Sequence, residues 1–141
     1  MTSEPHRSGS ISTIDEVECW QLVDTTTVGR LAFTTEDGIV ILPVNFVVFE
    51  ERIYVRTEPG SSIAALADGR DDVAFEVDYH DGMNQSGWNV LMKVTATTAE
   101  PAAAENALAS TGRLGPWPPG NRSLVIALTP RSIGGRRVAM H

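Results

Sequence analysis

The segment from Val28 to Thr57 carries the strongest structural signal in this chain. Three runs rich in β-branched and aromatic residues follow one another there, VGRLAFTT, IVILPVNFVVF and IYVRT, with only short turns between them. The first turn contains the pair Asp37-Gly38, which is typical of a β-hairpin. The segment therefore predicts an antiparallel meander of three strands. Pro43 lies inside the second strand and cannot donate to a ladder, so we expect a bulge or a sheet edge at that position.

The rest of the chain continues the β pattern and inserts short helices. Further strands are expected over DVAFEVDY (72–79), GWNVLMKVTATTA (87–99), SLVIALTP (123–130) and, as a short addition, SIGGRRV (132–138). Helices are expected over residues 14–25, 62–69 and 101–112, and the prolines of RLGPWPPGN make residues 113–121 a loop. About six strands with short helices predict a mainly β fold, an antiparallel barrel with the helices packed outside.

The N-terminus divides into a polar arm and the start of the domain. Residues 1–12 are rich in Ser, Thr and Pro and offer little to bury, so we expect a disordered arm. Thr13 and Glu16 match a capping box, which favours Thr13 as the N-cap of the first helix. With 141 residues, the chain is expected to form a single domain over residues 13–141.

Composition excludes several classes of function. The net charge of −7 disfavours nonspecific binding to nucleic acid or to anionic lipid. No apolar run approaches the ~20 residues that span a bilayer, and the opening lacks the apolar region of a signal peptide, so a cytoplasmic location is expected. Cys19 is the only cysteine, which excludes an intrachain disulfide and any site built from several cysteines.

Few residues suggest chemistry of their own. His80 lies near Asp78 and Asp81, but without a second imidazole a solvated loop is a better interpretation than a metal site. Cys19 lies within a predicted helix beside Trp20, as a buried structural thiol would. No serine stands in a G-x-S-x-G motif, and the sequence shows no hydrolytic machinery.

The strand-to-helix junction YVRTEPGSSIAAL is the strongest candidate for a binding site. A helix that begins here would present unpaired backbone N–H groups, and the hydroxyls of Ser61 and Ser62 would add donors for a phosphate. Arg56, at the end of the preceding strand, is placed to supply a bidentate guanidinium. The alternative is a helix cap at Ser61 or Ser62 with a solvated arginine. Trp88 and Trp117 offer aromatic faces for a planar ligand, although each is also a common core or interface residue.

Several of these segments together resemble the pyridoxamine 5′-phosphate oxidase-like, flavin-binding split-barrel proteins, specifically the small actinobacterial type. The resemblance covers about residues 16–138 and is carried by VGRLAF, LPVNF, YVRT with PGSS, VAFEVD, SGWNV and PWPPGNRSLVIALTPRSIGGRRV. It implies a six-stranded antiparallel split β-barrel that dimerises and binds two FMN molecules between the subunits. Because some relatives bind deazaflavin F420 or haem, these two cofactors are alternatives to FMN.

The resemblance also implies the residues that contact the cofactor. The phosphate would lie over Arg56, Thr57, Ser61 and Ser62, and the ring would pass the backbone of Pro43, Val44 and Asn45. Gln85, Ser86 and Trp88 match a segment that approaches the flavin from the other subunit, and Trp117 would close one side of the pocket. The flavin would carry out the redox chemistry, so no separate catalytic residue is predicted.

Two positions depart from the pattern of this family. Many relatives have a lysine where this chain has Ser62, which removes one charge from the phosphate site, and many have a glycine where this chain has Val94. Oxidation of pyridoxamine phosphate is not expected, because only Arg136 and Arg137 remain as basic residues near the C-terminus. Two functions follow: an FMN-dependent oxidoreductase acting on a small molecule, or a cofactor-binding sensor or carrier without turnover.

Overall fold

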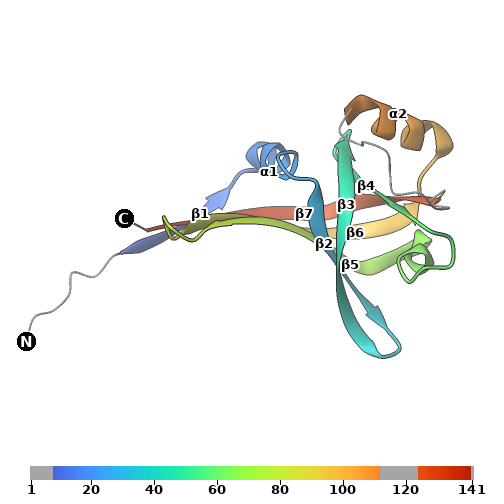
Figure 1. The fold of residues 1–141 in the computed structure, drawn as a ribbon, viewed down its shortest axis with the longest axis horizontal. Coiled ribbons are helices and arrows are strands. Elements are labelled where there is room, and N and C mark those ends of the chain that lie inside the picture. Colours follow the sequence, from blue (N-terminus) through green and yellow to red (C-terminus); the bar gives the residue numbers. More distant parts are fainter. Residues whose placement is uncertain (1–7, 112–123, 141) are drawn as a thin grey trace, which may run out of the picture.

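The computed structural model describes residues 8–111 and 124–140 as a strongly β fold with two α-helices (Figure 1). The strands are β1 (Gly9–Ile14), β2 (Val28–Thr35), β3 (Gly38–Phe49), β4 (Arg52–Thr57), β5 (Asp68–Asp81), β6 (Ser86–Thr98) and β7 (Leu124–Met140). The helices are α1 (Glu16–Val23), α2 (Pro101–Thr111) and the short 3-10 helix η1 (Ala64–Ala67). Among the described residues, no helix is long and apolar enough to cross a membrane.

Six of the strands close into a ring. The strand order is β1-β7-β4-β3-β2-β5-β6, and a further pairing between β6 and β7 joins the two sides of the barrel. All seven strand pairings are antiparallel. The expected six-stranded antiparallel split β-barrel is therefore confirmed, and β1 is an additional strand that pairs with β7 outside the ring.

Alternation along the strands separates the interior of the barrel from its outer surface. Leu31, Phe33, Phe75 and Met92 point inward and are buried, while their chain neighbours are mostly exposed. The rings of Phe46 and Phe75 meet edge to face with centroids 5.0 Å apart. Away from helix α2, the outer surface can therefore carry polar and ligand-binding residues.

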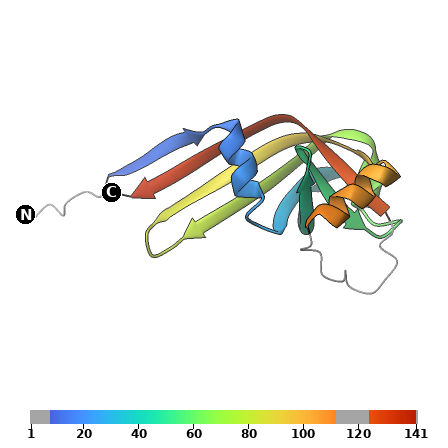
Figure 2. The ribbon, with the colours of Figure 1, turned by 90° about the horizontal axis from the view of Figure 1, so that it is seen from above.

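Beyond the barrel, β5, β6, β7 and β1 continue as an extended sheet that ends near the N- and C-termini (Figure 2). Helix α1 lies across the inner face of this extension, where Cys19 and Ile14 are buried. A Cβ on Gly135 would lie 2.8 Å from Cys19 Sγ and 3.1 Å from Ile14 Cβ. Glycine at this position therefore allows α1 and β1 to pack closely on β7.

Helix α2 covers a second, smaller core on the outside of the barrel. Its alanines Ala104 and Ala107 pack with Val47, Tyr54 and Ala127 of three strands. Small side chains let the helix approach the sheet closely. The helix predicted over residues 101–112 is confirmed as α2, Pro101–Thr111.

The N-terminal elements differ from the sequence prediction. Residues 9–12, expected in a disordered arm, belong to β1, because pairing with the distant strand β7 satisfies their backbone. The first helix spans Glu16–Val23 instead of residues 14–25, and its N-cap is Asp15, whose Oδ1 accepts the Glu18 N–H at 2.8 Å. Thr13, predicted as the cap, is the fifth residue of β1.

Two further predictions are corrected. The helix expected over residues 62–69 is the four-residue 3-10 helix η1, and Asp68 and Gly69 already belong to β5. The two expected C-terminal strands are one strand, β7. It passes Pro130 by a register shift against β6, where Val94 pairs with Pro130 and Lys93 pairs with Ser132. A β-bulge thus accommodates the residue that cannot donate.

Candidate functional site

Strands β3 and β4 separate part-way along their length, and most of the predicted cofactor-binding residues lie at this point. Their ladder runs from Phe49 and Arg52 to Phe46 and Val55 and then ends. Beyond it, β3 stays paired with β2, while β4 continues beside β7. The residues that flank the separation, here called the β3–β4 divergence, are Pro43, Val44, Asn45, Arg56, Thr57, Ser61 and Ser62.

The β4 side of the divergence is held by a small hydroxyl network. Thr57 is buried, and its Oγ1 lies 2.7 Å from Ser61 Oγ, which also accepts the Ala64 N–H at 3.1 Å. Ser61 therefore stabilises the turn that leads into η1, whose N-cap is Ile63. Ser62 beside it is exposed, and Arg56 is half-buried. The side-chain cap predicted at Ser61 or Ser62 is not found at the N-cap of η1, which is Ile63, although Ser61 accepts one N–H of this helix. Ser62 is accessible to a ligand.

The prediction that a helix begins near Ser61 and binds a phosphate through its N-terminus was wrong. The helix that forms, η1, has four residues and 3-10 geometry. The alignment of peptide dipoles over so short an element is small, so the macrodipole contributes little there. An anion at this position would depend on Arg56, on exposed hydroxyls and on individual backbone N–H groups.

The β3 side of the divergence offers backbone groups. Phe46 donates its N–H to the Thr27 carbonyl at 3.0 Å, on the side of β2. Because N–H and C=O directions alternate along an extended strand, the N–H of Asn45 and the carbonyl of Pro43 point to the other side, toward the divergence, while the Asn45 carbonyl faces β4 at the end of the ladder. Pro43 has no N–H that would need a partner there. Of the expected bulge or sheet edge at the proline, the edge is confirmed, since among the described residues this part of β3 pairs only with β2.

A second group of predicted residues lies at the far end of the extended sheet. Ser86 and Trp88 are half-buried, and with Gln85 they line a hollow of about 390 Å³ at the end of the β5–β6 hairpin. Figure 1 places this hairpin end on the opposite side of the molecule from β4. One chain therefore does not bring this group to the β3–β4 divergence. Trp117 lies outside the described residues.

Asp81 fixes the turn of the β5–β6 hairpin. Its Oδ1 accepts the Met83 N–H at 3.1 Å, and its Oδ2 accepts the Asn84 side-chain amide at 2.7 Å. The amide and backbone N–H of Asn84 lower the pKa of Asp81. Asp78 is held in turn by Arg30 at 2.7 Å. Both carboxylates near His80 thus have other partners, and the described residues contain no group of three or more metal-ligating side chains.

Cys19 has the character of a structural thiol. It is fully buried, and its Sγ lies 3.6 Å from the Ile14 carbonyl. Burial, followed by the nearby carboxylates of Asp15 and Glu18, raises the pKa of the thiol. A thiol held in its protonated form is a poor nucleophile, in agreement with the sequence interpretation.

A polar network crosses the outer face of the barrel. Arg30 of β2 contacts Asp78 at 2.7 Å and Glu76 at 3.5 Å, both on β5. Glu76 accepts the Asn89 side-chain amide of β6 at 3.3 Å. This network takes up two acidic groups. Among the described residues, Lys93 and Arg136 of the same face make no ion pair.

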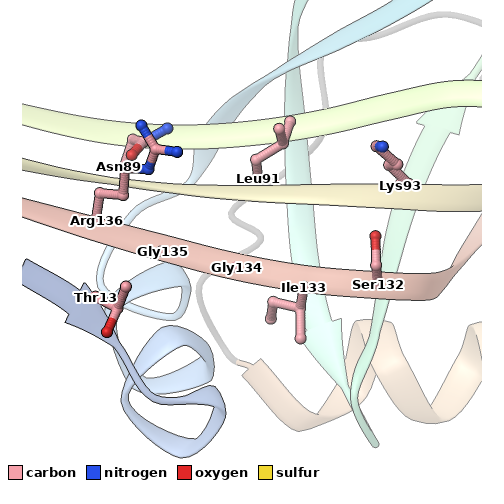
Figure 3. A pocket seen from close by; sticks show the side chains of 9 residues that line it. All are labelled: Thr13, Asn89, Leu91, Lys93, Ser132, Ile133, Gly134, Gly135 and Arg136. Atoms are coloured by element: carbon pink, nitrogen blue, oxygen red, sulfur yellow. The ribbon is translucent and has the colours of Figure 1, made fainter.

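Lys93 and Arg136 line a hollow of about 600 Å³ between β6 and β7, which was not predicted from the sequence (Figure 3). Lys93 stands at one end of the hollow and Arg136, beside Asn89, at the other. Arg136 entered the sequence analysis only as a leftover basic residue. The sequence signal for this hollow was the alternation of Asn89, Leu91 and Lys93, which places these side chains on one face of a strand. The pairing of that strand with β7 could not be predicted from the alternation.

Comparison with known proteins identifies the family. The family described as pyridoxamine 5′-phosphate oxidase matches residues 15–137, which is most of the chain. The chain belongs to this family. Its closed ring of antiparallel strands is the split barrel that the resemblance implied.

Individual similar proteins agree with this assignment. The FAD-binding protein from Mycobacterium smegmatis is 30% identical, with a TM-score of 0.75, and the match covers 89% of this chain and 98% of that one. A conserved protein of unknown function from Corynebacterium diphtheriae is also 30% identical, with a TM-score of 0.69 over 93% of this chain and 98% of that one. An uncharacterised protein of Mycobacterium tuberculosis is 27% identical over 140 residues, 96% of this chain and 91% of its own length.

Proposed function

We propose that this protein binds a flavin at the β3–β4 divergence and uses it in an oxidoreductase reaction on a small molecule. The observation that carries the proposal is that Pro43–Asn45 of β3 and Arg56 and Thr57 of β4 flank the point where the two strands separate, with Thr57 bonded to Ser61. We infer that Ser62, the next residue, faces the same ligand. Family membership and the description of a relative with 30% identity as FAD-binding support the same ligand class.

The residues at the divergence fit the two ends of FMN. Arg56 and the exposed hydroxyl of Ser62 suit a phosphate, since a guanidinium and hydroxyl groups are strong donors to phosphate oxygens. The outward N–H of Asn45 and the Pro43 carbonyl suit the polar edge of a flavin ring, which has both donors and acceptors. When bound, the flavin would supply hydride chemistry, and the chain would orient it and exclude water.

We further propose that the active form is a homodimer with the cofactor at the subunit interface. Gln85, Ser86 and Trp88 lie away from the divergence within one chain, so a second subunit is the source from which they would reach a flavin. Exposed aliphatic side chains also project from the outer face of the barrel and its extension, and a partner would cover them. These residues are Ile11, Val28, Ile39, Ile41, Leu91 and Val138.

Flavin binding is tested by titrating FMN into the purified protein and following the quenching of flavin fluorescence. Arg56→Ala should weaken binding at least tenfold, since a hydrogen bond to a charged group contributes about 1.5–3 kcal/mol. Arg52→Ala is the matched control, because it removes the same charge from the other end of β4. Equal affinity of both variants and the wild type would refute the phosphate site, and absence of any FMN or FAD binding would refute the function.

A parallel experiment separates the cofactor alternatives and the role in turnover. The wild-type protein is incubated with FMN, FAD, F420 or haem, and the bound cofactor is identified by its absorbance spectrum after removal of the free ligand. We expect a flavin spectrum. Turnover with NADH or NADPH and an electron acceptor is expected of an oxidoreductase, whereas a flavin-loaded protein without turnover would be a carrier or sensor.

A further inference from the structure

We propose that Asp81 is a positioning residue, which holds the turn of the β5–β6 hairpin in the conformation that directs Gln85 toward the flavin of the partner subunit. This inference rests on the proposed function, in which Gln85, Ser86 and Trp88 of one subunit approach the cofactor bound by the other. Asp81 itself is the last residue of β5 and is not expected to touch the flavin. Three features of the turn carry the inference: its hydrogen bonds, its exposure and the backbone conformation of Gln85.

The ladder between β5 and β6 fixes the hairpin only as far as the pair formed by Asp81 and Ser86. In the preceding pair, His80 lies opposite Gly87, and a Cβ on Gly87 would lie 2.7 Å from the Tyr79 carbonyl oxygen. The two strands are therefore in close contact up to the turn. Residues 82–85 belong to neither strand, so the ladder does not set their conformation.

The carboxylate of Asp81 orders this turn. Its Oδ1 accepts the backbone N–H groups of Met83 at 3.1 Å and of Asn84 at 3.3 Å, and its Oδ2 accepts the Asn84 side-chain amide at 2.7 Å. These contacts, the Asn84 amide first, lower the pKa of Asp81, so the carboxylate is ionised at neutral pH and acts only as an acceptor. Residues 82–85 are exposed in the single chain, and burial therefore does not order them. The contacts of Asp81 define the part of the hairpin that the ladder leaves free.

Gln85 has an unusual backbone conformation that this turn imposes. Its φ is +48°, in the left-handed region that residues other than glycine rarely adopt. Such a conformation persists where neighbouring contacts determine the backbone, and Asn84, bonded to Asp81 through both backbone and side chain, directly precedes Gln85. Gln85 and Ser86 line the hollow of about 390 Å³ that would face the partner's flavin. A segment fixed before binding loses less conformational entropy when the ligand arrives, so Asp81 should raise FMN affinity without contacting FMN.

The experiment measures FMN affinity of the full-length protein by quenching of flavin fluorescence, and dimerisation by sedimentation equilibrium. Asp81→Ala removes the hydrogen bonds to the turn and should weaken FMN binding about threefold to tenfold while dimerisation is unchanged. Thr35→Val is the matched control, because Thr35 Oγ1 accepts the Asp37 N–H at 3.2 Å and donates to the Gly38 carbonyl at 3.0 Å in the turn between β2 and β3. This control also removes hydrogen bonds from an exposed hairpin turn, but it should leave FMN affinity unchanged.

A double-mutant cycle tests whether Asp81 acts through Gln85. Glycine adopts a positive φ without strain, so Gln85→Gly removes the side chain and keeps the turn. In this background, Asp81→Ala should change FMN affinity by less than about twofold, since the side chain that Asp81 positions is gone. A purely structural role of Asp81 would give the same loss in both backgrounds.

The outcomes separate this proposal from the proposed function. Unchanged FMN affinity of Asp81→Ala, in a protein whose Arg56→Ala variant binds FMN more weakly, would overturn the positioning role and leave flavin binding standing. Equal effects of Asp81→Ala in the two backgrounds, an equal loss in Thr35→Val, or a loss of affinity that follows a loss of dimer would also overturn it. Absence of FMN binding by the wild type would overturn both proposals.

Discussion

Ser61 was predicted to bind a phosphate, but its hydroxyl has a structural role in the turn after β4. Its hydroxyl contacts Thr57 and accepts the Ala64 N–H, so it holds the turn that connects β4 to η1. Ser62, one residue later, is exposed. The two serines looked equivalent in the sequence, and the structure separates a hydroxyl engaged in the turn from one that is accessible to a ligand. For the proposed phosphate, the residue to vary is therefore Ser62.

Ser62→Lys should tighten FMN binding about threefold to tenfold. An ammonium group at this position would add a favourable charge beside the proposed phosphate, and at an exposed site such a contact contributes about 1 kcal/mol. Ser62→Met is the matched control, because it adds a chain of similar length without charge. Fluorescence titration at low and high salt measures both variants. If lysine and methionine give the same affinity, the phosphate does not lie at Ser62.

At the scale of the elements, the strands that depend on local sequence were predicted well. VGRLAFTT and IVILPVNFVVF coincide with β2 and β3 to within one residue, because alternation and the Asp37-Gly38 turn are local signals. β1 was missed because its stability comes from pairing with β7, more than a hundred residues away. β7 was divided at Pro130 because a bulge cannot be read from the sequence of one strand.

The same limit applies to the candidate site. The segments around Pro43 and Arg56 could be predicted, because the resemblance fixes their positions and β3 and β4 are neighbours in the chain. The hollow between Lys93 and Arg136 could not, because it exists only where β6 and β7 pair across a long sequence separation.

The junction between β2 and β5 contains an acid-sensitive contact. Arg70 Nε donates to Asp72 Oδ1 at 2.8 Å, and Thr34 of β2 donates to Oδ2 of the same carboxylate. The hydrogen bonds from Arg70 and Thr34 hold the pKa of Asp72 well below its usual range. The ionised carboxylate therefore stabilises the fold above the unfolded-state pKa of about 3.9, and this contribution is lost as the pH falls through the lowered pKa.

Asp72→Asn should therefore lower the thermal midpoint at pH 7, and the difference from the wild type should shrink as the pH falls below about 4. Asp71→Asn is the control at the adjacent position, where the described residues show no hydrogen bond to the carboxylate. Thermal unfolding followed by circular dichroism across this pH range measures both variants. A constant difference between Asp72→Asn and the wild type at all pH values would contradict the account.

At the scale of the whole molecule, the outer face of the barrel carries the surface features that bear on dimerisation. Exposed aliphatic side chains, the Arg30 network and the cationic hollow all lie on this face. Trp88, which the sequence offered as an aromatic face for a planar ligand, is half-buried and packs against the core. The reason to expect a shared interface is the aliphatic surface.

Ile41→Asp should weaken the proposed dimer at least tenfold, because it places a charge on the apolar outer face of β3. Ile41 is 63% exposed in the single chain, and Val17→Asp on α1 is a matched control at 70% exposure. Sedimentation equilibrium measures both, with FMN titration in parallel. If flavin binds between subunits, Ile41→Asp should lose FMN affinity together with dimerisation. A wild type that is monomeric at all concentrations would exclude the dimer.

The central claim is that a flavin occupies the place where β3 and β4 separate. The most direct measurement is a crystal structure of the protein with FMN. We expect the flavin ring beside the backbone of Pro43 and Asn45, and the phosphate within hydrogen-bonding distance of Arg56 and Ser62. A structure in which FMN lies elsewhere, or in which the chain's own side chains fill the divergence and leave no room for a phosphate, would contradict the account.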